Sequence, residues 1–129
     1  MLDTNIISDL MRNPQGKAAK RLAKVGETDI CTSIVVAAEL RYRCAKNGSK
    51  QLLDTVEAIL AEIEVLPFDA PADAAYGEIR AGLEAAGTPI GGNDLLIAAH
   101  ARALDAIMVT ANAGEFRRVR GLKVENWLT

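Results

Sequence analysis

The sequence predicts an α/β fold: a single three-layer domain over residues 1–129, with a mainly parallel central sheet flanked by helices. Short β-like apolar runs alternate along the chain with longer segments whose apolar residues recur at the helical period. Strands separated by helical crossovers pair in parallel, and parallel sheets are covered on both faces. The chain has 129 residues, enough for one domain that buries roughly two-thirds of the surface exposed on unfolding.

The first half of the chain is predicted to contain two short strands and four helices. In order, they are a strand over residues 1–2, helices over 6–11 and 17–25, a strand over 29–33, and helices over 34–46 and 51–63. Asn47-Gly48 offers the left-handed residue that often follows a helix, and Ser49 is a favourable N-cap for the next one. The apolar stripe of the helix over 51–63 is expected to pack on the core, with a dimer contact or a groove for a partner protein as alternatives.

The second half repeats the alternation. It is predicted to contain a strand over 64–67, a helix over 71–86, a loop over 88–92, a helix over 93–104, a strand over 107–110, a loop or short turn over 111–116, and a strand over 122–127. Pro71 suits the first turn of its helix, and Gly87 ends that helix. The helix over 93–104 is apolar nearly all round, which predicts that it is buried.

Charges are segregated along the chain although the net charge is only −2. Three stretches are basic (Arg12, Lys17, Lys20, Arg21, Lys24; Arg41, Arg43, Lys46, Lys50; Arg117, Arg118, Arg120, Lys123), whereas residues 51–79 hold seven acids and no base. This asymmetry indicates either one face for an anionic polymer or ordinary solvated helix faces.

The chain is expected to be cytoplasmic and not to enter a membrane. No apolar run approaches the length of about 20 residues that a membrane span needs, and no signal peptide is recognisable. Cys31 and Cys44 are therefore expected to be reduced thiols, and the single histidine, His100, is expected to pack on its helix. With no His or Cys cluster, a zinc site is not predicted.

Acidic and polar side chains fall near the ends of the predicted strands. Asp3 ends the first strand, Glu39 lies on the helix after the second, and Asp94 opens the buried helix; Thr110 and Asn112 follow the fourth strand. The carboxyl ends of parallel strands form the rim where ligands bind in such sheets. We therefore expect these groups to meet there and hold Mg²⁺, which prefers oxygen ligands, with Mn²⁺ able to substitute.

Each carboxylate also has an ordinary structural interpretation. Asp3 could cap a helix, a contribution of about 1 kcal/mol. Glu39 could pair with Arg43 one helical turn away, and Asp94 could simply complement the helix dipole. The combination favours a metal site, because Glu39 and Asp94 lie in otherwise apolar helices, where a carboxylate is unfavourable unless it is paired or binds a metal.

Four segments resemble the signature blocks of the PIN-domain family, and most closely its VapC toxins from bacterial type II toxin–antitoxin systems. They are LDTN at 2–5, SIVVAAELRY at 33–42, GNDLLIAAHA at 92–101 and VTANAGEF at 109–116, in the family's order. The resemblance extends to Trp127. It implies a metal-dependent endoribonuclease that hydrolyses RNA phosphodiester bonds and is neutralised by a cognate VapB-type antitoxin. We also expect a homodimer.

By position, the resemblance assigns the site residues. Asp3, Glu39 and Asp94 match the family's three acidic metal-site residues, and of these Asp3 and Asp94 are expected to bind the metal. The fourth acidic place falls at Asn112, where many members carry aspartate, and Glu115 either serves instead or is only a surface residue. The resemblance also implies that four small polar residues orient carboxylates or waters around the site: Thr4, Asn5, Ser33 and Thr110.

The chemistry expected of this site is hydrolysis by a metal-activated water, with phosphates of the RNA held by Arg12, Lys17, Lys20, Arg21 and the basic residues after Phe116. Arg43 departs from the family pattern, since a glycine commonly follows Tyr42 there, and it adds charge near the rim. Aromatic residues make up only 4% of the chain, so base stacking is not expected to be a major source of recognition. The alternative is a catalytically silent PIN-like module that binds RNA or a partner. A phosphoacceptor domain is disfavoured, because the adjacent carboxylates and late lysine that it needs are missing.

Overall fold

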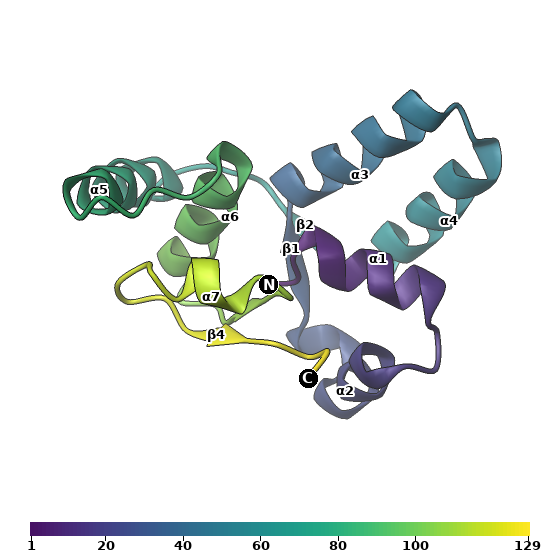
Figure 1. Cartoon of the computed structure of the whole chain (residues 1–129). Coiled ribbons are helices and arrows are strands. Elements are labelled where there is room, and N and C mark those ends of the chain that lie inside the picture. Colours follow the sequence, from purple (N-terminus) through teal and green to yellow (C-terminus); the bar gives the residue numbers. More distant parts are fainter.

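Short parallel strands run through the centre of the protein (Figure 1), in a computed structural model that describes residues 1–129. Strand β1 (Cys31–Ser33) pairs with β2 (Glu64–Leu66), and β3 (Met108–Val109) pairs with β4 (Val124–Glu125), both in parallel. Leu2 forms parallel bridges to Thr32 and to Val109 and so joins the two pairs. The resulting order is β2-β1-Leu2-β3-β4, which confirms the predicted parallel sheet.

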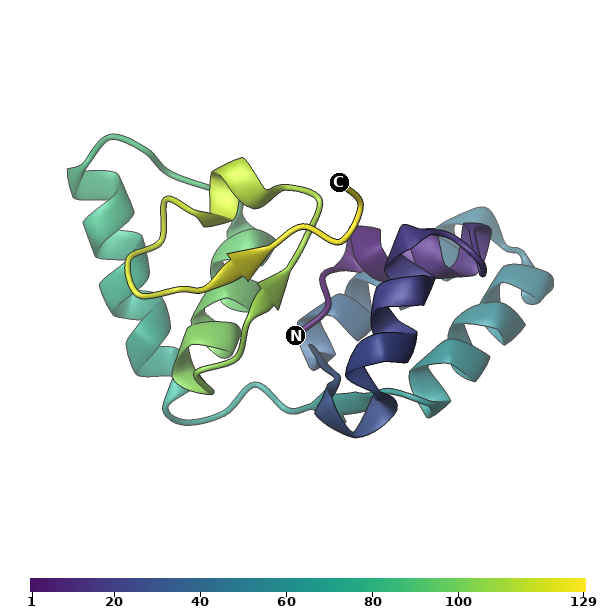
Figure 2. The same cartoon turned by 90° about the horizontal axis from the view of Figure 1, so that it is seen from below.

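Helices cover this sheet in two groups that Figures 1 and 2 both separate. One group comprises α1 (Thr4–Arg12), α2 (Lys17–Val25), α3 (Ile34–Asn47) and α4 (Lys50–Ala61), with a 3₁₀ turn, η1 (Glu27–Asp29), after α2. The other comprises α5 (Ala72–Ala85), α6 (Gly92–Ala103) and the short α7 (Ala113–Phe116). The N-terminus lies between the two groups (Figures 1 and 2), where Leu2 bridges the strand pair β1–β2 to the pair β3–β4.

The helix boundaries follow from identifiable caps. The Ser49 hydroxyl accepts a hydrogen bond from the Leu52 N–H at 3.2 Å, and Gly48 adopts a left-handed φ of 64°, both as predicted. Several boundaries differ from the prediction by a few residues, and the loop or turn predicted over 111–116 contains the short helix α7. The opening strand is reduced to bridges at Leu2. Pro71 precedes α5 as its N-cap, and the Ala72 N–H donates a hydrogen bond to the Asp69 carbonyl at 2.8 Å.

The core lies between the sheet and the helices on both sides. Helix α6 is buried over Ile97–Ala101, as its composition predicts, and Val56, Leu60 and Ile63 place the stripe of α4 and its end in the core. Both cysteines are free thiols. None of the helices combines the length and apolar character needed to cross a membrane.

Candidate active site

Asp3 is a nearly buried carboxylate at the centre of the sheet, with 3% of its surface exposed. It caps α1, since Oδ1 accepts a hydrogen bond from the Thr4 N–H at 2.8 Å. Its other oxygen, Oδ2, accepts from the Thr110 hydroxyl at 2.7 Å and from the Asn5 amide at 3.2 Å. Burial raises the pKa of Asp3, and the hydrogen bonds oppose that rise. The helix-cap interpretation is correct, and the same residue also lies at the rim.

Glu39 reaches the same place from α3. Its Oε1 accepts a hydrogen bond from the Thr4 hydroxyl at 2.8 Å. Thr4 therefore holds two carboxylates, Asp3 through its backbone N–H and Glu39 through its side chain. The alternative pairing with Arg43 is wrong, because the Arg43 guanidinium instead donates to the Ser8 hydroxyl on α1 at 2.9 Å.

Asp94 lies in the first turn of α6 and is partly buried. Burial is the largest cause that raises its pKa, to about 7, and the charge of Glu115 is the next. The charges of Asp3 and Glu39 raise it further, so the carboxylates of Glu115, Asp3 and Glu39 all lie within electrostatic reach of Asp94. The three acids that the sequence singles out, from three separate elements, therefore converge at one rim.

Glu115 joins this group, whereas Asn112 lies at its edge. A hydrogen bond with Glu115 also raises the pKa of Asp94, and Glu115 Oε1 accepts from the Gly91 N–H at 3.1 Å. The Asn112 side chain is exposed and makes no hydrogen bond, although its backbone N–H donates to the Thr110 hydroxyl at 3.0 Å. The sequence did not decide which of the two residues completes the site. The signal for Glu115 is its position three residues after Asn112, in the first turn of α7.

The small polar residues named from the sequence divide into two sets. Thr4, Asn5 and Thr110 bind the carboxylate of Asp3 directly. Ser33 instead caps α3 and contacts Nδ1 of His100 at 2.7 Å, away from the carboxylates. His100 is 2% exposed and packs edge-on against Phe68, and burial lowers its pKa. These contacts support the predicted packing role of His100.

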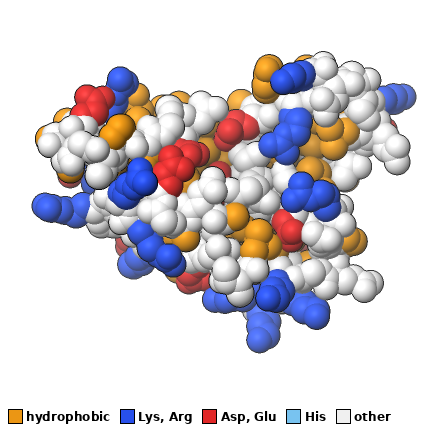
Figure 3. Space-filling view, viewed as in Figure 1, with side chains coloured by type: hydrophobic (Ala, Val, Ile, Leu, Met, Phe, Trp, Pro, Cys, Tyr) orange, Lys and Arg blue, Asp and Glu red, His pale blue; other side chains and the backbone are white.

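The donor set fits a hard divalent cation. All the converging groups supply oxygen, which Mg²⁺ and Mn²⁺ prefer, and after burial the charges of Glu115, Asp3 and Glu39 contribute to the raised pKa of Asp94. No three of the Asp, Glu, His or Cys side chains lie close enough together to hold a metal ion by themselves. This is consistent with Mg²⁺, which usually takes one or two carboxylates and keeps several waters. Figure 3 shows acidic atoms where α3 meets the α6–α7 region, with basic atoms on either side.

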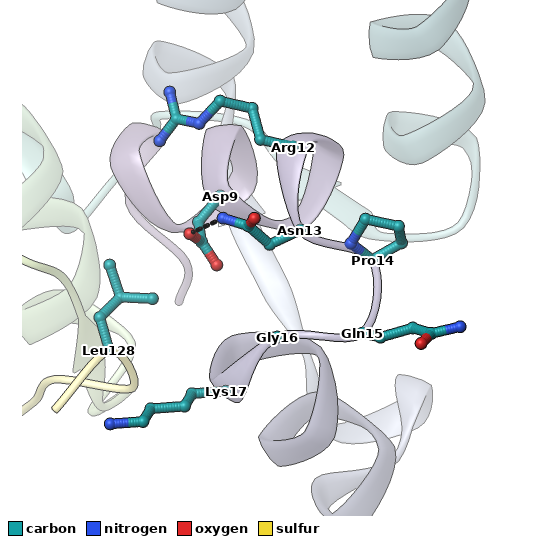
Figure 4. A pocket seen from close by; sticks show the side chains of 8 residues that line it. All are labelled: Asp9, Arg12, Asn13, Pro14, Gln15, Gly16, Lys17 and Leu128. Atoms are coloured by element: carbon teal, nitrogen blue, oxygen red, sulfur yellow. Dashed lines mark hydrogen bonds between the residues drawn. The ribbon is translucent and has the colours of Figure 1, made fainter.

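A hollow lies beside α1, next to Arg12 and Lys17, two of the cations expected to hold RNA phosphates (Figure 4). It has a volume of about 590 Å³ and is lined by Asp9, Arg12, Asn13, Pro14, Gln15, Gly16, Lys17 and Leu128. Its carboxylate, Asp9, accepts a hydrogen bond from the Asn13 amide at 2.8 Å. Figure 4 shows the Arg12 and Lys17 side chains pointing in different directions, so these two cations do not converge on one anion.

Comparison with known proteins identifies the same family that the four sequence blocks resemble. The PIN domain family model matches residues 1–122. Ribonuclease VapC2 of Rickettsia felis is 39% identical over 129 residues, covering 98% of this chain and 96% of the relative. The tRNA(fMet)-specific endonuclease VapC of Shigella flexneri is 38% identical over 128 residues, with the same coverage.

Solved structures agree with these sequence relatives. A chain in the VapBC2 complex of Rickettsia felis, bound to a promoter DNA fragment, superposes with a TM-score of 0.91 at 38% identity, covering 98% of this chain and 97% of that one. A chain in the DNA-bound VapBC complex of Salmonella typhimurium gives a TM-score of 0.91 at 35% identity, covering 98% and 96%. The chain is therefore a PIN-domain protein and belongs with the VapC ribonucleases.

Proposed function

We propose that this protein is a divalent-metal-dependent endoribonuclease and the toxin of a toxin–antitoxin pair. The observation that carries the proposal is the convergence of Asp3, Glu39 and Asp94 at the end of the parallel sheet, where Thr4 binds two of them and the third has its pKa raised by both. The names of the VapC relatives, which are ribonucleases and endonucleases, support RNA as the substrate. A catalytically silent module has no comparable support.

Asp3 and Asp94 are the residues that would hold Mg²⁺ or Mn²⁺. The ion would polarise the scissile phosphate and neutralise charge that develops on its oxygens. Thr110, Asn5 and the Thr4 N–H fix the orientation of Asp3, so this carboxylate is positioned before any substrate arrives. Such preorganisation reduces the rearrangement needed during the reaction.

Glu39 is the residue that we assign to proton transfer. Its carboxylate is partly buried and held by the Thr4 hydroxyl at 2.8 Å, close to but not part of the Asp3 hydrogen-bond set. As water attacks the phosphorus, Glu39 accepts its proton while the bond from phosphorus to the leaving ribose oxygen breaks, and that oxygen takes up a proton from solvent. Asn112, exposed at the rim, can hold a water there through its amide, whereas Glu115 orients Asp94.

The antitoxin is the expected protein partner. The two solved structures compared above are named as VapBC complexes bound to DNA. By analogy, a VapB-type protein would neutralise this chain, and a homodimer remains our expectation for the toxin. The name of the Shigella relative makes initiator tRNA a sensible first RNA to test.

The test is RNA cleavage by purified protein, with end-labelled tRNA and Mg²⁺ or Mn²⁺. Asp94→Asn should abolish cleavage and leave the circular dichroism spectrum unchanged. Asp73→Asn, which removes an exposed carboxylate from α5, is the matched control and should retain activity. Full activity in Asp94→Asn would remove Asp94 from the site, and cleavage by neither the parent nor the control would refute the proposed function.

A further inference from the structure

A groove runs along α3 from the candidate active site. Its volume is about 530 Å³, and it is lined by Val35, Ala38, Glu39, Tyr42, Arg43, Lys46, Asn47 and Asn93. Glu39 belongs to the carboxylate group described above, and Asn93 is the neighbour of Asp94 in α6. The groove is therefore continuous with the place where the scissile phosphate would lie.

The side chains along this groove share one face of α3. Glu39, Tyr42, Arg43 and Lys46 occupy positions i, i+3, i+4 and i+7, which lie above one another on a helix. At a rise of 1.5 Å per residue, Glu39 and Lys46 are separated by about 10 Å along the helix axis. The order along the face is thus a carboxylate at the active-site end, then an aromatic ring and a guanidinium, then an ammonium group.

Both cations of the groove are available for an anion. Neither Arg43 nor Lys46 forms an ion pair, although five other ion pairs occur in the protein. The hydrogen bond from Arg43 to Ser8 at 2.9 Å holds the guanidinium toward α1 and leaves its other N–H groups free. Phosphate is the anion that this arrangement suits, because the guanidinium offers several donors in one plane.

Tyr42 is the most exposed aromatic residue of the protein, at 67%. The other aromatic side chains are buried or partly buried: Phe68, Tyr76, Phe116 and Trp127. An exposed ring between a carboxylate and two cations matches the pattern of single-strand binding sites, in which bases stack on aromatic side chains while cations follow the backbone. Stacking of one base is compatible with the low aromatic content of the chain, because one well-placed ring is enough for one base.

We propose that the α3 groove binds the nucleotide next to the scissile phosphate, with its base stacked on Tyr42 and its phosphate on Arg43 and Lys46. This inference rests on the proposed function, since it places single-stranded RNA across the same rim. It names the element that contacts a base, for which the basic residues alone provide no ring.

The experiment measures RNA binding in an Asp94→Asn background, so that the probe is not cut. Two labelled probes of equal length are compared by fluorescence anisotropy: a short single-stranded RNA of mixed sequence and an abasic ribose-phosphate chain. Tyr42→Ala should weaken binding of the RNA about tenfold and leave the abasic chain unaffected, and Tyr42→Phe should bind both like the parent. Lys46→Ala should weaken both probes and lower the salt slope by about one, whereas Arg80→Ala on α5, whose guanidinium is already paired with Glu84, should change neither.

Three outcomes would overturn the inference. Tyr42→Ala could bind RNA as tightly as Tyr42→Phe, or it could lose affinity equally for both probes, which would exclude stacking. It could also keep its affinity while sedimentation shows a changed oligomeric state, which would make this face of α3 a protein interface. If the parent protein cleaves RNA and Tyr42→Ala binds RNA normally, only the proposal for the α3 groove is refuted. If the parent binds RNA through Tyr42 but does not cleave it, only the proposed nuclease function is refuted.

Discussion

Replacing Asp94 by asparagine should stabilise the folded protein near neutral pH and have much less effect in acid. Burial and the charges of Glu115, Asp3 and Glu39 raise the pKa of Asp94 to about 7 in the folded chain. In the unfolded chain an aspartate has a pKa of about 3.9. Between these two values the folded state binds more protons than the unfolded state, so the wild-type protein loses stability as the pH rises through this window.

The size of this effect follows from the same difference. Between the ordinary value of 3.8 and about 7, at 1.36 kcal/mol per unit of pKa, the full penalty would be roughly 4 kcal/mol. Asp94 is only partly buried, so water screens much of this repulsion, and we expect about 1–2 kcal/mol at neutral pH. For a domain of this size that corresponds to a rise in Tm of about 3–8 °C.

The assay is thermal unfolding of the wild type and of Asp94→Asn in EDTA, at several values between about pH 5 and pH 8. The advantage of the variant should grow with pH and level off above the pKa of Asp94. Mg²⁺ should stabilise the wild type more than the variant, because it also relieves the repulsion that the Asp94 carboxylate adds. A stability difference that stays constant across this range, or that shrinks as the pH rises, would refute the electrostatic explanation.

Three further predictions concern the same rim. EDTA should stop RNA cleavage and added Mg²⁺ or Mn²⁺ should restore it, whereas activity that persists in the chelator would contradict the metal mechanism. Thr110→Val should lower the free energy of unfolding in urea by about 1–3 kcal/mol, because the buried Asp3 carboxylate loses its 2.7 Å hydrogen bond, and Thr110→Ser should lose much less. Asn112→Asp should preserve or strengthen Mg²⁺ binding in calorimetry, and a large loss of affinity would show that the neutral amide is required.

Local signals in the sequence predicted most of the helices but not the full extent of the strands. The stripe of α4, the Ser49 cap and the apolar surround of α6 are properties of short segments, and each appears in the structure where expected. The opening strand could not be delimited in this way. Leu2 is extended because Thr32 and Val109 bridge it from both sides, and no local pattern shows those partners.

The site could be predicted as a set of residues but not as a set of contacts. Strand ends and family blocks selected Asp3, Glu39 and Asp94, and the structure brings them together. Which hydrogen-bond donor each carboxylate accepts from was not predictable. Glu39 accepts from the Thr4 hydroxyl on α1, whereas Arg43 on its own helix donates to Ser8. Hydrogen bonds between elements depend on how the helices pack, and helix packing is not encoded in spacing along one segment.

The bridges of Leu2 have a consequence for synthesis of the protein on the ribosome. Leu2 pairs with Val109 and Asp3 accepts a hydrogen bond from Thr110, so the segment around Asp3 takes its final place only after residues 109–110 have been made. Every incomplete translation product that stops before this point lacks one wall of the rim. We therefore expect products that stop before residue 110 to hold Asp3 without its Thr110 donor and to lack nuclease activity.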